Sequence, residues 1–341
     1  METKQWTLNE IKQAAQVLKR GGLLAFPTET VYGLGANALM SSAVQQVFEV
    51  KGRPSDNPLI VHVPNFEQVK GYVENLHPEA QNLVNMYWPG PLTLVCQVKS
   101  GVFAKEVSAG LSTVSFRMPD NEVTLKLLEE SGVPAVGPSA NTSGKPSPTS
   151  CEHVYHDLQG KIEGILDDGS TKIGVESTVI DISDPTKVPM ILRPGAITKE
   201  QIKEDLGIEV SYDNHLLKDS STPKSPGMKY KHYAPATNVL MVKDNDWDAA
   251  VRWVKENHLC AGVLASPSIC DKLRADTAAT FTYSDNSVQA ATKGLYAGLR
   301  ALDETPLKLD VILAATFPEE GLGVAYMNRL KKAAAQEYFE S

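Results

Sequence analysis

The chain has 341 residues, of which 42% are hydrophobic and 22% are charged, and its formal net charge is −8 at pH 7. This length favours two domains over a single core, and the composition is that of an ordinary globular protein. The acidic balance argues against a protein that coats nucleic acid or an anionic membrane through its overall charge.

The cysteines and the first residues bear on compartment and metal binding. Cys96, Cys151, Cys260 and Cys270 form no CxxC pair and no spacing typical of zinc ligands, so we expect reduced, mostly buried thiols and no metal held by the protein. The start, Met1 to Gln5, is polar and unlike a secretory signal. Since no apolar run approaches the ~18 residues of a membrane span, we expect a cytoplasmic protein without membrane association.

The first two hundred residues predict a mixed α/β domain. Thr7 and Glu10 form a capping box before apolar positions at helical spacing, and Gly21-Gly22 ends this helix. Short apolar runs predict the strands. The expected helices cover residues 8–18, 42–50, 78–86, 122–130, 149–158 and 199–206. The expected strands cover residues 23–26, 59–63, 92–98, 114–117, 134–136, 177–181 and 191–193. This order of elements favours a mixed sheet.

The composition changes after Val210. Residues 211–235 are polar and rich in proline, lysine and tyrosine, which predicts a linker. Strands then alternate with helices, which is typical of a smaller parallel-sheet α/β domain. The expected strands cover residues 239–242, 261–265 and 311–315. The expected helices cover residues 247–257, 287–302 and 324–335, with one more near Asp271. We therefore predict domains over 1–210 and 236–341 that are joined by residues 211–235.

Two familiar nucleotide signatures are missing. Gly33-Leu34-Gly35 begins like a dinucleotide-binding fingerprint, but Ala38 stands where the third glycine belongs. No GxxxxGK[ST] loop occurs either. A nucleotide site in this chain must therefore be of another kind.

A cation pair follows the second expected helix. Lys51 supplies a mobile point charge and Arg53 a planar, two-pronged donor for phosphate oxygens. Gly52 between them permits close approach of the backbone to a ligand. Taken alone, however, residues 51–58 fit a solvated turn better than a phosphate site.

The loop over residues 137–147 follows a short apolar strand and is dense in hydroxyls, amides and glycines. Its backbone N–H groups can form a nest for an anion, with serine and asparagine side chains as further donors. A plain connecting loop explains this composition equally well.

Several polar residues lie on strands that are otherwise apolar. His62 interrupts one strand, although a lone strand histidine is more often a core or edge residue than a ligand. Arg117 and Arg193 each end a strand, an awkward place for a charge unless an anion meets it. We expect these cations to converge at one edge of the sheet. Residues 28–30 and 176–178 add hydroxyls and acids at comparable strand ends.

Taken together, these residues closely resemble the threonylcarbamoyl-AMP synthase family, whose shared unit is the YrdC domain. The resemblance covers about residues 10–210. The matching segments are Phe26–Leu34, Lys51–Arg53, Asn57–Leu59, Trp88–Thr93, Phe116–Pro119, Ser139–Gly144, Ser177–Val179 and Arg193–Gly195. Residues 225–235, followed by an α/β domain, look like the long two-domain form. The resemblance implies a twisted mixed-sheet YrdC-like domain and a smaller, Rossmann-like parallel α/β domain.

The resemblance also implies a reaction. L-Threonine, bicarbonate and ATP, with Mg²⁺ assisting, would give threonylcarbamoyl-adenylate and pyrophosphate. The product would be handed over to a tRNA threonylcarbamoyl transferase complex, which modifies the adenosine beside the anticodon. Lys51 and Arg53 would face the phosphates as catalytic cations, and the predicted L-threonine site comprises Thr28, His62, Arg117 and Ser177. The predicted ATP site comprises Lys51, Ser55, Thr113, Ser139, Asn141, Ser147, Arg193 and, as a lid on the linker, Tyr230.

Two other functions agree less well with the sequence. A module that binds tRNA or double-stranded RNA without chemistry disagrees with the acidic charge and with the lack of RNA-stacking aromatic motifs. Carbamoyl transfer as in hydrogenase maturation would need acylphosphatase and zinc-finger segments, which the sequence lacks.

Overall fold

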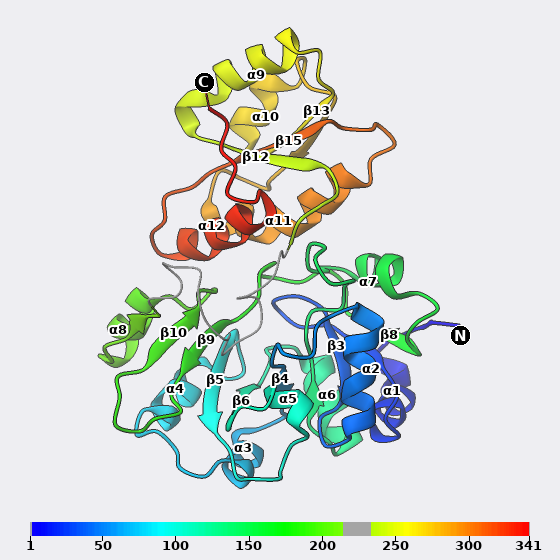
Figure 1. Ribbon diagram of the computed structural model, residues 1–341, viewed down its shortest axis with the longest axis vertical. Coiled ribbons are helices and arrows are strands. Elements are labelled where there is room, and N and C mark those ends of the chain that lie inside the picture. Colours follow the sequence, from blue (N-terminus) through cyan, green and yellow to red (C-terminus); the bar gives the residue numbers. More distant parts are fainter. Residues whose placement is uncertain (1, 214–232, 341) are drawn as a thin grey trace. The chain divides into compact units, whose positions relative to one another are not determined.

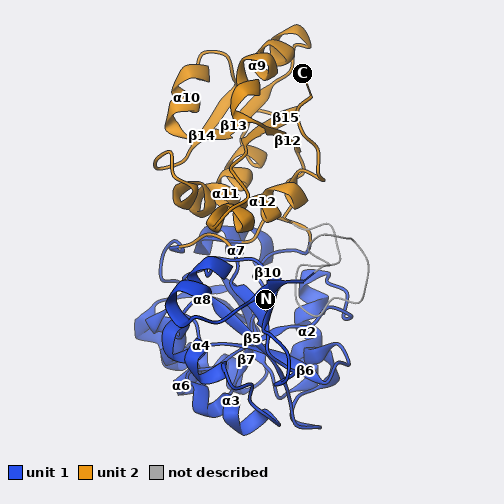
Figure 2. Cartoon of the chain, turned by 90° about the vertical axis from the view of Figure 1, so that its left-hand side faces the viewer, with its two compact units in different colours: residues 1–143, 148–172, 176–230 blue, residues 144–147, 173–175, 231–341 orange. Residues whose placement is uncertain are grey.

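Short strands and intervening helices build two separate units in the computed structural model, which describes residues 2–213 and 233–340 (Figure 1). Unit 1 comprises residues 1–143, 148–172 and 176–230, and unit 2 comprises residues 144–147, 173–175 and 231–341 (Figure 2). Two short loops that are flanked in the sequence by unit 1 thus belong to unit 2. In residues 2–213 and 233–340, no helix has both the length and the apolar character to cross a membrane.

Unit 1 is built on one large sheet of mixed direction, in the order β1-β8-β2-β3-β7-β4-β6-β5-β9-β10-β11. Its strands are β1 (Lys4–Trp6), β2 (Leu24–Phe26), β3 (Gly33–Asn37), β4 (Ile60–His62), β5 (Leu92–Gln97), β6 (Thr113–Arg117), β7 (Ala135–Val136), β8 (Gly164–Leu166), β9 (Thr178–Asp181), β10 (Met190–Arg193) and β11 (Ser211–Tyr212). Its helices are α1 (Ile11–Lys19), α2 (Ser41–Lys51), α3 (Phe66–Tyr72), α4 (Ala80–Tyr87), α5 (Lys105–Ser108), α6 (Glu122–Ser131), α7 (Cys151–Leu158) and α8 (Lys199–Leu206).

Strand periodicity divides the side chains of the central strands between two faces. Val61 of β4 and Phe116 of β6 join the main apolar cluster of unit 1. Because successive strand residues point to opposite faces, the next residues, His62 and Arg117, lie on the other face. The alternation therefore places polar groups on one face at the ends of β4 and β6.

Unit 2 contains a wholly parallel four-stranded sheet in the order β12-β15-β13-β14. Its strands are β12 (Asn238–Val242), β13 (Ala261–Ala265), β14 (Ala279–Thr282) and β15 (Val311–Ala315). Its helices are α9 (Trp247–Glu256), α10 (Pro267–Leu273), α11 (Val288–Asp303) and α12 (Leu322–Ala333). Helices α9 and α10 cover one face and α11 and α12 the other (Figure 1), as right-handed β-α-β crossovers require.

The sheets confirm the predicted fold class, a mixed sheet followed by a smaller parallel one. The capping box of Thr7 and Glu10 is also confirmed, although it caps a 3₁₀ turn that leads into α1. Strand β3 was not predicted, because the glycines of its sequence are uncommon in strands. The polar segment after Val210 begins with strand β11.

Candidate active site

Polar residues of four strands form one row across the sheet of unit 1. His62 pairs with Arg117, and Val179 pairs with both Thr93 and Arg193. The antiparallel register of β5 and β6 sets Thr93 opposite Arg117. Since β6 and β10 run in the same direction, both arginines end their strands at one edge, about 14 Å apart by three strand spacings. The two cations thus lie at the same edge of the sheet, as predicted, but three strand spacings separate them.

Arg117 is almost completely buried, with 4% of its surface exposed. One terminal nitrogen lies 2.6 Å from a carboxylate oxygen of Glu29, which is itself 3% exposed. The other terminal nitrogen donates to the hydroxyl of Thr30 at 2.9 Å, and Nε donates to the carbonyl of Gly90 at 3.2 Å. A buried charge requires such partners because desolvation is costly.

Thr28 orders the loop that carries these partners. Its hydroxyl donates to the Val31 carbonyl at 2.6 Å and accepts from the Thr30 N–H at 3.1 Å. The hydroxyls of Thr28 and Thr30 lie 2.8 Å apart. Thr28 is therefore connected to Arg117 through Thr30, so two of the residues predicted to bind the amino acid belong to one hydrogen-bonded group.

His62 is a neutral histidine in a tightly packed position. Its ring is 2% exposed and packs edge-on against Phe26, with 5.3 Å between the ring centroids. A Cβ at Gly137 would lie 2.6 Å from Nδ1, so the backbone there comes very close to the ring. Burial and the nearby Arg117 charge lower the pKa of the imidazole to about 3. In the described residues, Nδ1 has no hydrogen-bond partner.

Ser177 lies between Thr93 and Arg193 and is fully buried. The hydroxyls of Ser177 and Thr93 are 2.7 Å apart. Arg193 donates to the Ser177 hydroxyl and to its carbonyl, both at 3.0 Å. The structure thus brings a residue predicted for the amino acid into contact with one predicted for the nucleotide.

Lys51 is hydrogen-bonded to the backbone of the predicted nucleotide loop. It is 2% exposed, and its ammonium group donates to the carbonyl of Ser139 and, at 2.6 Å, to that of Asn141. The Ser143 N–H in turn donates to the Lys51 carbonyl at 2.8 Å. The loop starts at Gly137, against the ring of His62, and ends on Lys51. One loop therefore connects the two groups of predicted residues.

The remaining predicted residues are more dispersed. Arg53 is half-buried and donates to the Pro58 carbonyl at 3.3 Å, and it lines a surface hollow of about 400 Å³ together with the exposed Ser55. Thr113 begins the strand that Arg117 ends, so the structure does not bring these two together. Ser147 is buried and belongs to unit 2. Tyr230 lies outside the described residues.

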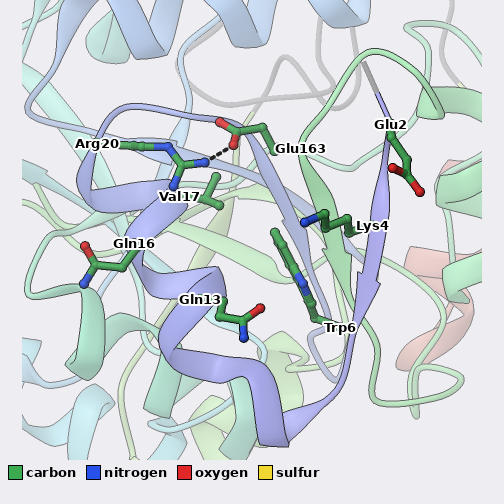
Figure 3. A pocket seen from close by; sticks show the side chains of 8 residues that line it. All are labelled: Glu2, Lys4, Trp6, Gln13, Gln16, Val17, Arg20 and Glu163. Carbon is green, nitrogen blue, oxygen red and sulfur yellow. Dashed lines mark hydrogen bonds and ion pairs between the residues drawn. The ribbon is translucent and has the colours of Figure 1, made fainter.

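A second surface hollow, of about 460 Å³, contains none of the predicted residues. Figure 3 shows its walls, which consist mostly of long polar side chains, and the ion pair of Arg20 with Glu163 at its rim. The side chains that line it are Glu2, Lys4, Trp6, Gln13, Gln16, Val17, Arg20 and Glu163. Their mixed charges do not select one class of ligand.

The cysteines and carboxylates of the described residues form no second reactive site or metal site. All four cysteines are free thiols, three of them buried, and burial raises the pKa of the Cys96 thiol to about 12, which leaves it protonated and unreactive at neutral pH. Within the described residues, 2–213 and 233–340, no three side chains of His, Cys, Asp or Glu lie close enough together to hold a metal ion.

Two residues that are central in the structure have no predicted role from the sequence. Glu29 was noted only as an acid near a strand end, and Thr93 only as part of a motif. A buried strand-end arginine requires an anion, but nothing local in the sequence shows that Glu29 supplies it. Nothing local in the sequence identifies Thr93 as the partner of Ser177.

Two family descriptions together span most of the chain. The family described as "Telomere recombination" matches residues 16–195, and the one described as "Threonylcarbamoyl-AMP synthase, C-terminal domain" matches residues 197–335. Relatives named threonylcarbamoyl-AMP synthase are 43% identical in Bacillus subtilis, over 98% of both chains, and 45% identical in Pyrococcus abyssi, over 95% of this chain and 94% of the relative.

A solved structure agrees over the same length. The crystal structure of P. abyssi Sua5 complexed with L-threonine is 42% identical, covers 100% of both chains and superimposes with a TM-score of 0.91. The similarity therefore extends over both units and is not confined to the motifs of unit 1.

The ion pair of Glu29 and Arg117 predicts a stability effect. Glu29→Gln leaves Arg117 buried without its counter-charge, so we expect urea unfolding to show a loss of about 3–5 kcal/mol. The control is Glu67→Gln, whose exposed side chain pairs with Lys70 and whose loss should cost under about 1 kcal/mol. Equal costs for the two variants would contradict the central position of this pair.

The lowered pKa of His62 predicts a pH dependence. The folded state keeps the ring neutral, whereas the unfolded chain takes up a proton below about pH 6.5. The contribution of the neutral His62 ring to the free energy of unfolding is therefore complete above pH 6.5 and is lost as the pH falls toward 3. Relative to His62→Gln, the wild type should lose about 1.4 kcal/mol of unfolding free energy per pH unit below 6. A pH-independent difference between the two proteins would refute the buried neutral state.

Proposed function

The chain belongs to the threonylcarbamoyl-AMP synthase family, and we propose that it converts L-threonine, bicarbonate and ATP into threonylcarbamoyl-adenylate and pyrophosphate. The threonine amine first forms a carbamate with the CO₂ that bicarbonate supplies, with net release of one water and one proton. A carbamate oxygen then attacks the α-phosphorus, a new O–P bond forms, and the bond to the β-phosphate breaks. Pyrophosphate leaves with the electron pair of that bond.

The observation that carries the proposal is the loop over residues 137–143. It begins against His62, in the group predicted for the amino acid, and ends on Lys51, in the group predicted for the phosphates. The reaction brings one anion against another, so it requires cations on both sides of the new bond. Arg117 and Lys51 are buried cations placed at the two ends of this arrangement.

We assign the carboxylate of threonine to Arg117. Thr30 and Gly90 accept from two of the five N–H donors of the guanidinium, and in the described residues Glu29 faces Nη2 as an ion pair without a hydrogen bond. Terminal N–H donors therefore remain for a carboxylate, which accepts two of them in a two-pronged pair. Thr28, Ser177 and the neutral ring of His62 would recognise the rest of the amino acid without adding charge.

The phosphates are assigned to Lys51 and Arg53 and the rest of the nucleotide to a wider set. Lys51 is fixed by loop carbonyls, so its charge is in place before ATP binds, and Arg53, less buried, can turn toward a ligand. The wider set is Ser55, Thr113, Ser139, Asn141, Ser147 and Arg193, with Tyr230 as the lid that keeps water from the product.

Mg²⁺ is the expected companion of ATP. This ion usually keeps several waters and binds through substrate phosphates and few protein ligands. When bound, it would neutralise charge on the phosphates.

The product defines the next step. Its mixed anhydride is a reactive acyl donor, so an acceptor must take the threonylcarbamoyl group before water does. We propose transient hand-over to a tRNA threonylcarbamoyl transferase complex in the cytoplasm.

Pyrophosphate release from purified protein tests the activity. We expect release only with ATP, Mg²⁺, threonine and bicarbonate together, and mass spectrometry should find the acyl-adenylate. Lys51→Ala should lower the rate at least 1,000-fold, because it removes both a phosphate ligand and the support of the loop. Lys70→Ala, which alters a half-buried lysine that pairs with the exposed Glu67, is the matched control.

Turnover that does not depend on threonine would refute the proposal. The RNA-binding alternative makes the opposite prediction, since it requires a salt-dependent RNA affinity that survives Lys51→Ala and does not respond to ATP.

A further inference from the structure

Helix α11 of unit 2 contacts two short loops that come from elsewhere in the chain. Residues 144–147 and 173–175 belong to unit 2 and have its colour in Figure 2, although the residues on either side of each loop belong to unit 1. Both loops lie close in sequence to predicted site residues. The contacts of α11 with these loops therefore lie next to the predicted site.

The first contact is made by a buried arginine. Arg300 on α11 is 2% exposed, and it donates to the carbonyl of Pro146 from Nε at 3.1 Å and from Nη2 at 2.7 Å. Glu304, one helical turn further on, lies 3.7 Å from its other terminal nitrogen. Two charge-assisted hydrogen bonds to one carbonyl fix the peptide that precedes Ser147.

The second contact is a close approach of two backbones. Gly174 has a φ of +87°, and a Cβ there would lie 2.5 Å from the Lys293 carbonyl oxygen and 2.8 Å from that of Thr292. The loop over residues 173–175 thus rests directly on the α11 backbone. Only glycine combines this positive φ with this approach.

Each loop is tied at both ends to predicted site residues or their neighbours. Before the first loop, the Ser143 N–H donates to the Lys51 carbonyl at 2.8 Å, and after it the Pro148 carbonyl accepts from Tyr32 at 2.9 Å. Before the second loop, the Lys172 N–H donates to the Glu29 carbonyl at 3.1 Å, and Ser177 follows two residues after the loop.

We propose that α11 sets the positions of both loops. Arg300 is the positioning residue for residues 144–147, next to the predicted nucleotide site, and the contact at Gly174 positions residues 173–175, next to the predicted threonine site. This inference rests on the proposed function. It gives unit 2 a part in the reaction without a ligand site of its own. A disturbance at Pro146 should reach the ATP side through residues 141–147, and one at Gly174 should reach the threonine side through Ser177.

Steady-state pyrophosphate release separates these effects. Arg300→Gln should raise the KM for ATP about tenfold or more, because it removes the charged donors to Pro146, while the KM for threonine changes less than twofold. Arg300→Lys keeps the charge and one donor nitrogen, so its KM for ATP should lie between those of the wild type and Arg300→Gln. Gly174→Ala should show the reverse pattern, with the KM for threonine raised. Lys293→Ala, an exposed side chain on the same helix, should match the wild type.

The outcomes are distinct. A wild type that releases no pyrophosphate overturns the proposed function itself. An active wild type whose Arg300 variants match Lys293→Ala in both KM values overturns the inference alone, as do variants that lose kcat with both KM values unchanged. Thermal melting of each variant identifies any that fail to fold, and if Arg300→Gln does so, the milder Arg300→Lys decides by the same split between ATP and threonine.

Discussion

The ion pair of Glu29 and Arg117 is the interaction on which the candidate site depends. Arg117 ends a central strand, and its guanidinium joins two elements: the loop after β2, through Glu29 and Thr30, and the turn at Gly90. An arginine this deeply buried is tolerated only with a counter-charge and hydrogen bonds. The pair therefore determines how the loop after β2 is folded, and with it the position of Thr28.

The same pair leaves the site without an excess of charge. Glu29 compensates Arg117 before any substrate arrives, and His62 beside it stays neutral. The nucleotide side follows a similar rule, since the Lys51 ammonium is held by two loop carbonyls. Buried cations with fixed partners are preorganised, so little reorganisation is needed when an anion binds. In the proposed function, this preorganisation offsets the repulsion between carbamate and phosphate.

Much of this arrangement was predictable from local sequence patterns. Apolar runs and caps located most helices and strands, and the positions of Arg117 and Arg193 at strand ends predicted a cationic edge. Strand β3 was not predicted, because its glycines carry no strand signal and only its neighbours in the sheet define it. The role of Glu29 depends on strand register, and the contact of Arg300 with Pro146 spans 154 residues. Neither leaves a mark in a local pattern.

The central claim is that Arg117 receives the carboxylate of threonine. Calorimetric titration of the wild type and of Arg117→Lys with L-threonine and with L-threoninol, which lacks the carboxylate, tests it most directly. Lysine keeps a charge beside Glu29 but loses the planar fork. The account predicts that the wild type binds threonine at least tenfold more tightly than threoninol, and that Arg117→Lys removes most of this preference. Equal binding of the two ligands by the wild type, or an unchanged preference in Arg117→Lys, would contradict it.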